Sequence, residues 1–146
     1  MGNYKSRPAN SCSDELKKKI SEGYGVLRAR LNEDSCDEDT LLQTSEDEIG
    51  AASKNGFYRL QLAVYRGDTD AVQQLLTHGA DANVMGANKI PPLHIAAMCG
   101  FHEIIQILLE SKADVNLQDW VQFSPLHVAC YFNNDAVRKF CVLHGL

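Results

Sequence analysis

The chain has 146 residues, of which 45% are hydrophobic and 23% are charged, and its formal net charge is −5. This length suits one small domain, and an acidic chain lacks the basic footprint of a nucleic-acid-binding protein. The five cysteines are odd in number and include no Cys-x-x-Cys pair, so we expect no zinc site, disulfide framework or cofactor. The sequence shows neither a signal peptide nor a long apolar run, so we expect a cytoplasmic protein, with nuclear presence left open.

The first six residues, Met-Gly-Asn-Tyr-Lys-Ser, fit the pattern for N-myristoylation of Gly2. One myristoyl chain gives only marginal membrane binding unless a second signal supports it. The lysines at positions 17–19 would add about 1 kcal/mol each near an anionic membrane surface. Gly2 is therefore a candidate lipidation site for weak membrane association, and an unmodified N-terminus is the open alternative.

Residues 1–32 form an N-terminal arm that contains one predicted helix. A helix start at Ser11 and Asp14 precedes an apolar stripe, which consists of Leu16, Ile20, Tyr24, Leu27 and Leu31. Gly23 and Gly25 interrupt the stripe, and each weakens a helix by about 1 kcal/mol relative to alanine. We therefore predict a frayed amphipathic helix, with a short coiled coil as the alternative.

Residues 33–52 separate this arm from the rest of the chain. Between Glu33 and Glu48 there are eight carboxylates and no lysine or arginine. Such a segment has little to bury and is predicted to be a solvated acidic linker.

Residues 53–146 repeat with a step of 33 residues. The tetrapeptides at 60–63, 93–96 and 126–129 align at that step, and the second begins Leu-His-Ile-Ala after two prolines. In the middle unit two one-sided apolar stripes flank Gly100, as expected for two helices joined by a short turn. The units are 53–85, 86–118 and 119–146, and the third is incomplete because it stops where the first two continue. We expect a truncated product of a longer chain.

This period and motif resemble the ankyrin-repeat family. The resemblance implies an all-α solenoid of about three helix-turn-helix units with β-hairpin loops. In that family the motif histidine is structural and ties one unit to the next, which assigns such a role to His94 and His127. A repeated metal site is disfavoured because the first unit carries Gln61 at the matching position.

Ankyrin stacks present a concave surface to protein partners, so the 33-residue step predicts which side chains would lie there. The candidate protein-binding residues, rich in the types that dominate binding hot spots, are Tyr65, Arg66, Met98, Trp120, Val121, Tyr131 and Phe132. The alternative is that Tyr131 or Phe132 packs between repeats and that Trp120 folds back on Phe123.

The N-terminus and parts of the repeats also resemble the family of cardiac troponin I-interacting kinases, which are ankyrin-repeat kinases of the tyrosine-kinase-like group. The residues that carry this resemblance are 1–8, 14–15, 17–19, 55–57, 62–65, 115–119 and 123–127. It implies the regulatory, protein-binding end of such a kinase and a sarcomeric partner such as troponin I.

The motifs of kinase catalysis are absent from these 146 residues. There is no Gly-x-Gly-x-x-Gly loop, His-Arg-Asp or Asp-Phe-Gly. We therefore predict a non-catalytic interaction module with no small-molecule substrate. The alternative is that the chain is the truncated amino end of a protein kinase whose catalytic domain lies outside it.

Overall fold

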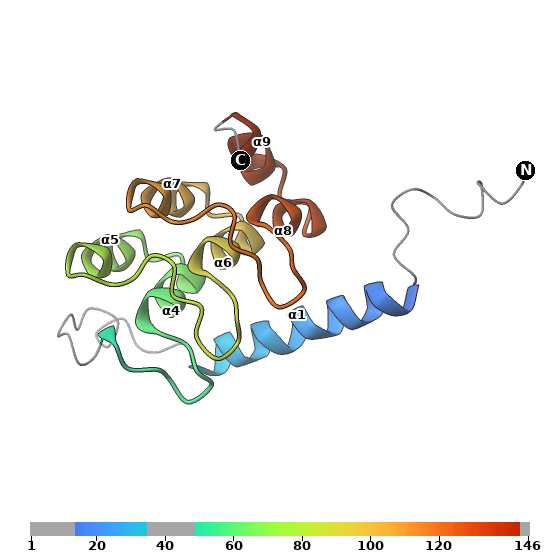
Figure 1. Ribbon diagram of the computed structural model, residues 1–146, viewed down its shortest axis with the longest axis horizontal. Coiled ribbons are helices and arrows are strands. Elements are labelled where there is room, and N and C mark those ends of the chain that lie inside the picture. The colour runs from blue at the N-terminus through green and yellow to red at the C-terminus, as the bar shows by residue number, and fades with distance from the viewer. Residues whose placement is uncertain (1–13, 35–48, 144–146) are drawn as a thin grey trace, which may run out of the picture.

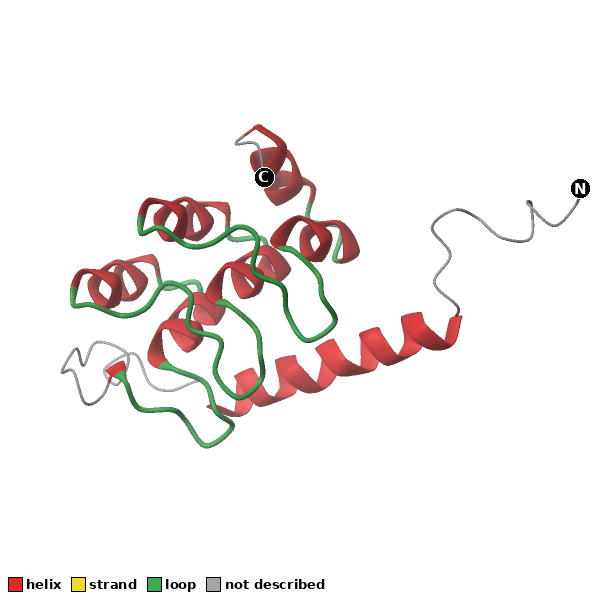
Figure 2. Cartoon of the chain, viewed as in Figure 1, coloured by secondary structure: helices red, strands yellow, loops and turns green. Residues whose placement is uncertain are grey.

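The computed structural model describes residues 14–34 and 49–143 (Figure 1). Gly2 and most of the acidic linker lie outside these described residues. The helices in the described part are α1 (Asp14–Asp34), α4 (Arg59–Arg66), α5 (Thr69–Thr77), α6 (Pro92–Cys99), α7 (His102–Glu110), α8 (Pro125–Tyr131) and α9 (Asp135–Leu143). The predicted all-α stack is confirmed. The loops between its units are turns, and none of the described residues lies in a strand (Figure 2).

The six helices from α4 to α9 form three antiparallel pairs that stack in two rows. The inner row consists of α4, α6 and α8, and the outer row of α5, α7 and α9 (Figure 1). Each pair buries a stripe of small and branched side chains against the next pair, as in Ala63, Ala96 and Ala129, which are fully buried. Small residues here let the inner helices approach closely.

Left-handed backbone conformations recur with the sequence period. Gly67, Gly100 and Asn133 all have positive φ, of 72°, 83° and 55°, where an inner helix turns into its outer partner. At Gly67 the conformation and the space agree, because a Cβ atom there would lie 2.9 Å from the ring of Phe101. Only glycine suits both conditions.

One buried polar side chain ties each of the first two repeats to the next. Gln61 donates through Nε2 to the carbonyls of Met85 (3.1 Å) and Ile90 (2.7 Å). His94, at the matching position, donates through Nε2 to the carbonyl of Phe123 (2.6 Å). Gln61 and His94 are both fully buried. Each side chain therefore satisfies a loop carbonyl that the stacking removes from water.

His127 has a different environment at the third matching position. Its ring is exposed, and Nδ1 accepts a hydrogen bond from the backbone N–H of Ser124 and lies 2.7 Å from that residue's Oγ. In the described chain it therefore caps the start of α8 and makes no tie between repeats.

The predicted frayed state of the arm helix differs from the structure. α1 runs for 21 residues, ends at Asp34, and packs along the repeats with Ile20, Tyr24, Leu27 and Leu31 buried. These side chains belong to the same hydrophobic core as the inner helices. The helix is ordered because its apolar stripe packs on the repeats. The sequence pattern alone did not identify the repeats as the surface that buries this stripe. The side chain of Leu16 lies outside the described residues.

The buried ring of His94 makes stability depend on pH. Burial lowers the pKa of His94 below its ordinary value of 6.5, because a charged imidazolium would lose its water. Nδ1 has no hydrogen-bond partner within the described structure, so an added proton would find no acceptor. Well above pH 6.5 the ring is neutral in both the folded and the unfolded state and contributes nothing to the pH dependence. Below it, the unfolded chain takes up the proton first and stability falls.

We predict that His94→Gln removes this acid sensitivity, because glutamine already makes the equivalent tie at Gln61. Between pH 7.5 and 5, the wild-type free energy of unfolding should decrease with a contribution from His94 of up to about 1.4 kcal/mol per pH unit. Urea unfolding at several pH values measures the slope. The control is His127→Gln, whose ring is exposed. Equal slopes in wild type and His94→Gln would contradict this assignment.

Candidate protein-binding surface

The concave surface of the stack is formed by the inner helices and by the turns that precede them, and α1 lies across it (Figure 1). The C-terminal end of α1 contacts the first turn, where the carboxylate of Asp34 accepts hydrogen bonds from Ser53 and Asn55. Its middle contacts the third turn at Asp119. α1 therefore spans all three repeats.

Tyr24 of α1 is the centre of an aromatic cluster on this surface. Its ring centroid lies 4.5 Å from that of Trp120 and 5.0 Å from that of Phe132, the latter edge-to-face. Tyr131 and Phe123 complete the cluster at 5.7 and 6.4 Å. Offset and edge-to-face aromatic pairs each add roughly 0.5–1.5 kcal/mol beyond the area that they bury. The cluster therefore adds an apolar contact between α1 and the third repeat to the burial of Tyr24.

The hydroxyl of Tyr24 donates a hydrogen bond to Oδ2 of Asp119. The other carboxylate oxygen, Oδ1, accepts from the backbone N–H groups of Val121 (3.0 Å) and Phe123 (2.9 Å). Burial, together with the nearby carboxylate, raises the pKa of Tyr24 far above its usual value, so the phenol stays protonated and remains a donor. Asp119 thus holds the third turn and α1 with one carboxylate.

Polar side chains at the rim of α1 add weaker contacts. Arg30 donates through Nη1 to Oδ1 of Asn88 at 3.0 Å, and the hydroxyl of Tyr65 donates to Oδ1 of Asn32 at 2.6 Å. Lys54 and Glu33 form an exposed ion pair at 3.0 Å. The pair lowers the pKa of Glu33, but exposed ion pairs contribute little to stability. The rim therefore contributes less to the docking of α1 than the buried contacts do.

α1 has low intrinsic stability for a helix of this length. Gly23 and Gly25 lie within it, at about 1 kcal/mol each relative to alanine. Its last turn carries Glu33 and Asp34 and no basic residue, which is unfavourable at the negative end of the helix dipole. The helix therefore depends on its contacts with the repeats.

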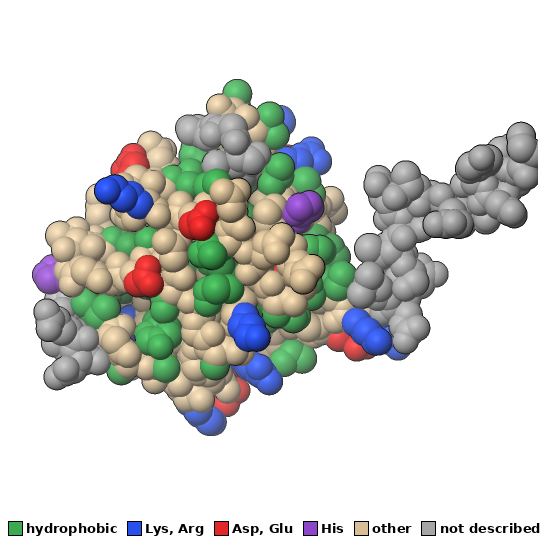
Figure 3. All heavy atoms as spheres, viewed as in Figure 1, with side chains coloured by type: hydrophobic (Ala, Val, Ile, Leu, Met, Phe, Trp, Pro, Cys, Tyr) green, Lys and Arg blue, Asp and Glu red, His purple; other side chains and the backbone are tan. Residues whose placement is uncertain are grey.

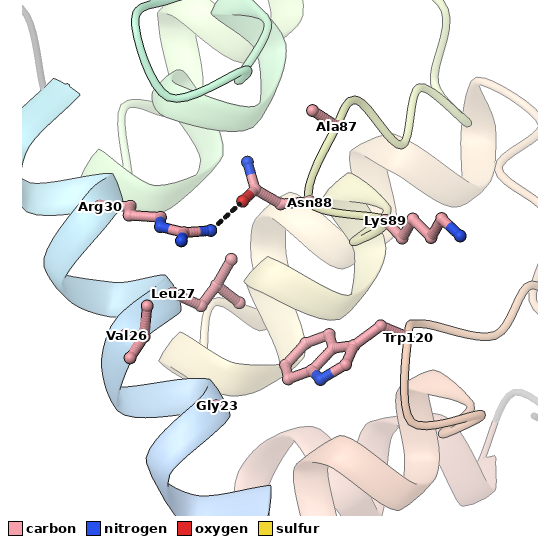
Figure 4. Close-up of a pocket in the computed structure, with 8 residues that line it drawn as sticks. All are labelled: Gly23, Val26, Leu27, Arg30, Ala87, Asn88, Lys89 and Trp120. Carbon is pink, nitrogen blue, oxygen red and sulfur yellow. Dashed lines mark hydrogen bonds between the residues drawn. The ribbon is translucent and has the colours of Figure 1, made fainter.

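The two glycines of α1 differ in their surroundings. A Cβ atom at Gly23 would lie 3.2 Å from Cζ2 of Trp120, whereas one at Gly25 would meet nothing within 4 Å. Figure 4 shows Trp120 facing the helix at Gly23. A side chain at position 23 would therefore press on the indole, whereas one at position 25 would enter open space.

Two shallow cavities flank α1 on the concave surface. One, of about 380 Å³, lies between α1 and the second and third turns and is drawn in Figure 4; it is lined by Gly23, Val26, Leu27, Arg30, Ala87, Asn88, Lys89 and Trp120. The other, of about 460 Å³, lies at the ends of the inner helices and is lined by Arg28, Tyr65, Met98, Cys99, Phe101, Phe132 and Asn134. α1 therefore fills the middle of the surface and leaves a hollow on each side.

The structure brings most of the candidate binding residues to this surface. Tyr65, Met98 and Phe132 line the second cavity, and Trp120 lines the first. Tyr131 joins the aromatic cluster.

The remaining candidates have different positions. Val121 is partly buried in the third turn, and Arg66 is exposed at the end of α4. The ring that stacks closest on Trp120 is Tyr24 of α1, whereas the alternative drawn from the sequence was Phe123.

Sequence reasoning missed Tyr24 and Asp119 as parts of this site. Tyr24 was recognised only as one member of an apolar stripe. Asp119 occupies the position of Ser53 and Gly86 in the earlier units, so a carboxylate there breaks the repeat pattern. That departure was the available signal.

Other kinds of site find little support in the described residues. Within residues 14–34 and 49–143, no cluster of three or more histidine, cysteine, aspartate or glutamate side chains is arranged to hold a metal ion. Among the helices described, none has the length and apolar character needed to cross a membrane. On the face shown in Figure 3, acidic and basic side chains are interspersed, and a few of them gather towards the lower edge.

Comparison with known proteins identifies the repeats. The family model described as ankyrin repeats, in three copies, matches residues 60–145. The serine/threonine-protein kinase TNNI3K of Mus musculus is 32% identical over 131 residues, covering 59% of this chain and 16% of the relative. The proteins of that name from Homo sapiens and Pongo abelii are each 30% identical. The chain spans only 16% of the length of the mouse and human relatives.

We predict that Tyr24→Phe lowers the free energy of unfolding by about 1.5–3 kcal/mol, because it removes a buried hydrogen bond to a carboxylate and keeps the ring. Tyr65→Phe is the matched control: it removes the exposed hydroxyl bonded to Asn32 and should cost less than about 0.5 kcal/mol. Urea unfolding followed by circular dichroism measures both. Equal losses of unfolding free energy in the two variants would show that the hydrogen bond from Tyr24 to Asp119 adds no stability of its own.

Proposed function

We propose that this chain, which belongs to the ankyrin-repeat family, acts through its concave surface as the protein-interaction region of a kinase-like protein. One observation carries the proposal. The inner helices and the third turn already hold an amphipathic helix, α1, by an aromatic cluster and a buried hydrogen bond. A surface that binds a helix in this way has the chemistry of a helix-binding groove.

The match to the mouse and human kinases covers 59% of this chain and 16% of their own length. The matched relatives are named as serine/threonine-protein kinases, and the motifs of kinase catalysis are absent from these 146 residues. We therefore propose a non-catalytic module. The second candidate is that the chain is the amino end of a kinase whose catalytic domain lies outside it, which sequencing of the transcript beyond the codon of Leu146 decides.

The protein partner is proposed from family resemblance. A sarcomeric protein such as troponin I is the first to test, because the sequence resembles the family of cardiac troponin I-interacting kinases. We propose that it contacts Tyr65, Arg66 and Met98 on the inner helices and the residues of the third turn and α8. Aromatic and arginine side chains in that set are the types that dominate binding energy.

For the partner surface, we predict that Trp120→Ala lowers the affinity for purified troponin I at least about thirtyfold, the loss typical of an aromatic hot spot. The repeat helices should stay folded, because the indole is partly exposed and its ring packs on Tyr24 of α1, so only the contribution of α1 to the helical signal should decrease. Isothermal titration calorimetry and circular dichroism measure the two effects. Val142→Ala, on an exposed side chain of α9, is the control. Loss of the cooperative unfolding transition of the repeats in Trp120→Ala would instead make the tryptophan structural.

We also propose a cytoplasmic location with weak membrane association through a myristoyl group on Gly2, a residue outside those described. Gly2→Ala should move the membrane-bound fraction of the protein into the soluble fraction, since acylation needs the N-terminal glycine. Cell fractionation measures the change, and metabolic labelling with a myristate analogue is the direct check. An unlabelled wild-type protein would exclude the lipid.

A further inference from the structure

The polar groups of the concave surface favour one direction of the helix that lies on it. At the third turn it presents an acceptor, the carboxylate of Asp119, which takes the hydroxyl proton of Tyr24. At the first turn it presents donors, the hydroxyl of Ser53 and the amide groups of Asn55, which bond to Asp34. A helix placed in reverse would put its carboxylate against Asp119.

The surface also fits a particular spacing of side chains along the helix. The buried apolar side chains of α1 are Ile20, Tyr24, Leu27 and Leu31, at i, i+4, i+7 and i+11. Gly23, at i+3, allows the indole of Trp120 to approach, since a Cβ atom there would lie 3.2 Å from it. Asp34 at i+14 ends the pattern. Together these positions restrict which helix sequences fit the surface more than an apolar stripe alone would.

α1 has features of an occupant that can be replaced. Gly25 weakens the helix although no neighbour requires a glycine there. The last turn of α1 places carboxylates at the negative end of the helix dipole. In the sequence, residues 35–48 connect α1 to the first repeat, so release of α1 would not detach it from the chain.

We propose that α1 occupies the concave surface in competition with an amphipathic helix of another protein. That helix carries a small residue at i+3, a tyrosine at i+4, apolar residues at i, i+7 and i+11, and a carboxylate at i+14. This inference rests on the proposed function and adds the class of partner and its regulation. Binding of the foreign helix displaces α1, and the apparent affinity is reduced by the fraction of molecules in which α1 is docked.

The matched pair Gly23→Gln and Gly25→Gln in the full-length chain tests the competition. Both changes raise the helix propensity of α1 equally, but only the first places a side chain against Trp120. The chain has a single tryptophan, so its fluorescence reports whether α1 is docked. Gly23→Gln should shift the emission to longer wavelength, and Gly25→Gln should leave it unchanged.

The binding probe is a fluorescent synthetic peptide with the sequence of residues 14–34, titrated into each full-length variant. Relative to wild type, Gly23→Gln should bind it at least tenfold more tightly. Gly25→Gln should bind it about fivefold more weakly, because its own α1 is stabilised. A peptide that carries Tyr24→Phe should bind Gly23→Gln at least tenfold more weakly than the native peptide, since it lacks the donor to Asp119.

The outcomes separate this inference from the proposed function. Unchanged emission and equal peptide affinity in all variants would show that α1 is a permanent part of the fold, which would overturn the competition. In that case the proposed function would still stand if Trp120→Ala weakens the binding of troponin I. A shifted emission without peptide binding would overturn the helix-binding surface itself. A dimer of Gly23→Gln that excess peptide does not dissociate would assign the surface to a second copy of the chain.

Hydrogen exchange of the wild-type chain gives an independent test if Gly23→Gln does not fold. The amides of α1 should exchange at least tenfold faster than those of α6, because α1 opens without unfolding of the repeats. Equal exchange rates in α1 and α6 would mean that α1 leaves only on global unfolding, and the competition would be wrong.

Discussion

The burial of Tyr24 on the third repeat is the contact on which the arrangement of this chain depends. Its ring packs on Trp120 and Phe132, and its hydroxyl satisfies a carboxylate that is 5% exposed. Without the tyrosine, Asp119 would keep two backbone partners but lose the donor at Oδ2. A buried carboxylate that lacks a donor is costly, so docking of α1 and the conformation of the third turn support each other.

The repeats position this site through hydrogen bonds between neighbouring units. Gln61 and His94 each bond a carbonyl of the next unit, so the turns are held at a fixed spacing along the stack. Because α1 contacts the first turn at one end and the third turn at its middle, it depends on that spacing over all three units. A stack of three repeats is about the smallest that is stable, and α1 adds its apolar stripe to the core.

The repeat period was enough to predict the helix pairs, the left-handed turn at Gly100 and the set of side chains on the inner helices. Each of these features recurs every 33 residues, so one unit supports the interpretation of another. The docking of α1 does not recur. Its stripe showed that the helix needs an apolar surface, but Asp119 lies 95 positions from Tyr24, and no local pattern joins them. The departure at Asp119 from Ser53 and Gly86 becomes meaningful only once α1 is in place.

The chain is therefore an ankyrin stack whose concave surface is covered by its own helix. Nuclear Overhauser contacts between the Tyr24 ring and the Trp120 indole in the full-length chain test this claim most directly. We predict strong cross-peaks, since the ring centroids are 4.5 Å apart, together with helical chemical shifts from Asp14 to Asp34. Absence of these cross-peaks, with random-coil shifts over α1, would show that the surface is uncovered and would contradict the account.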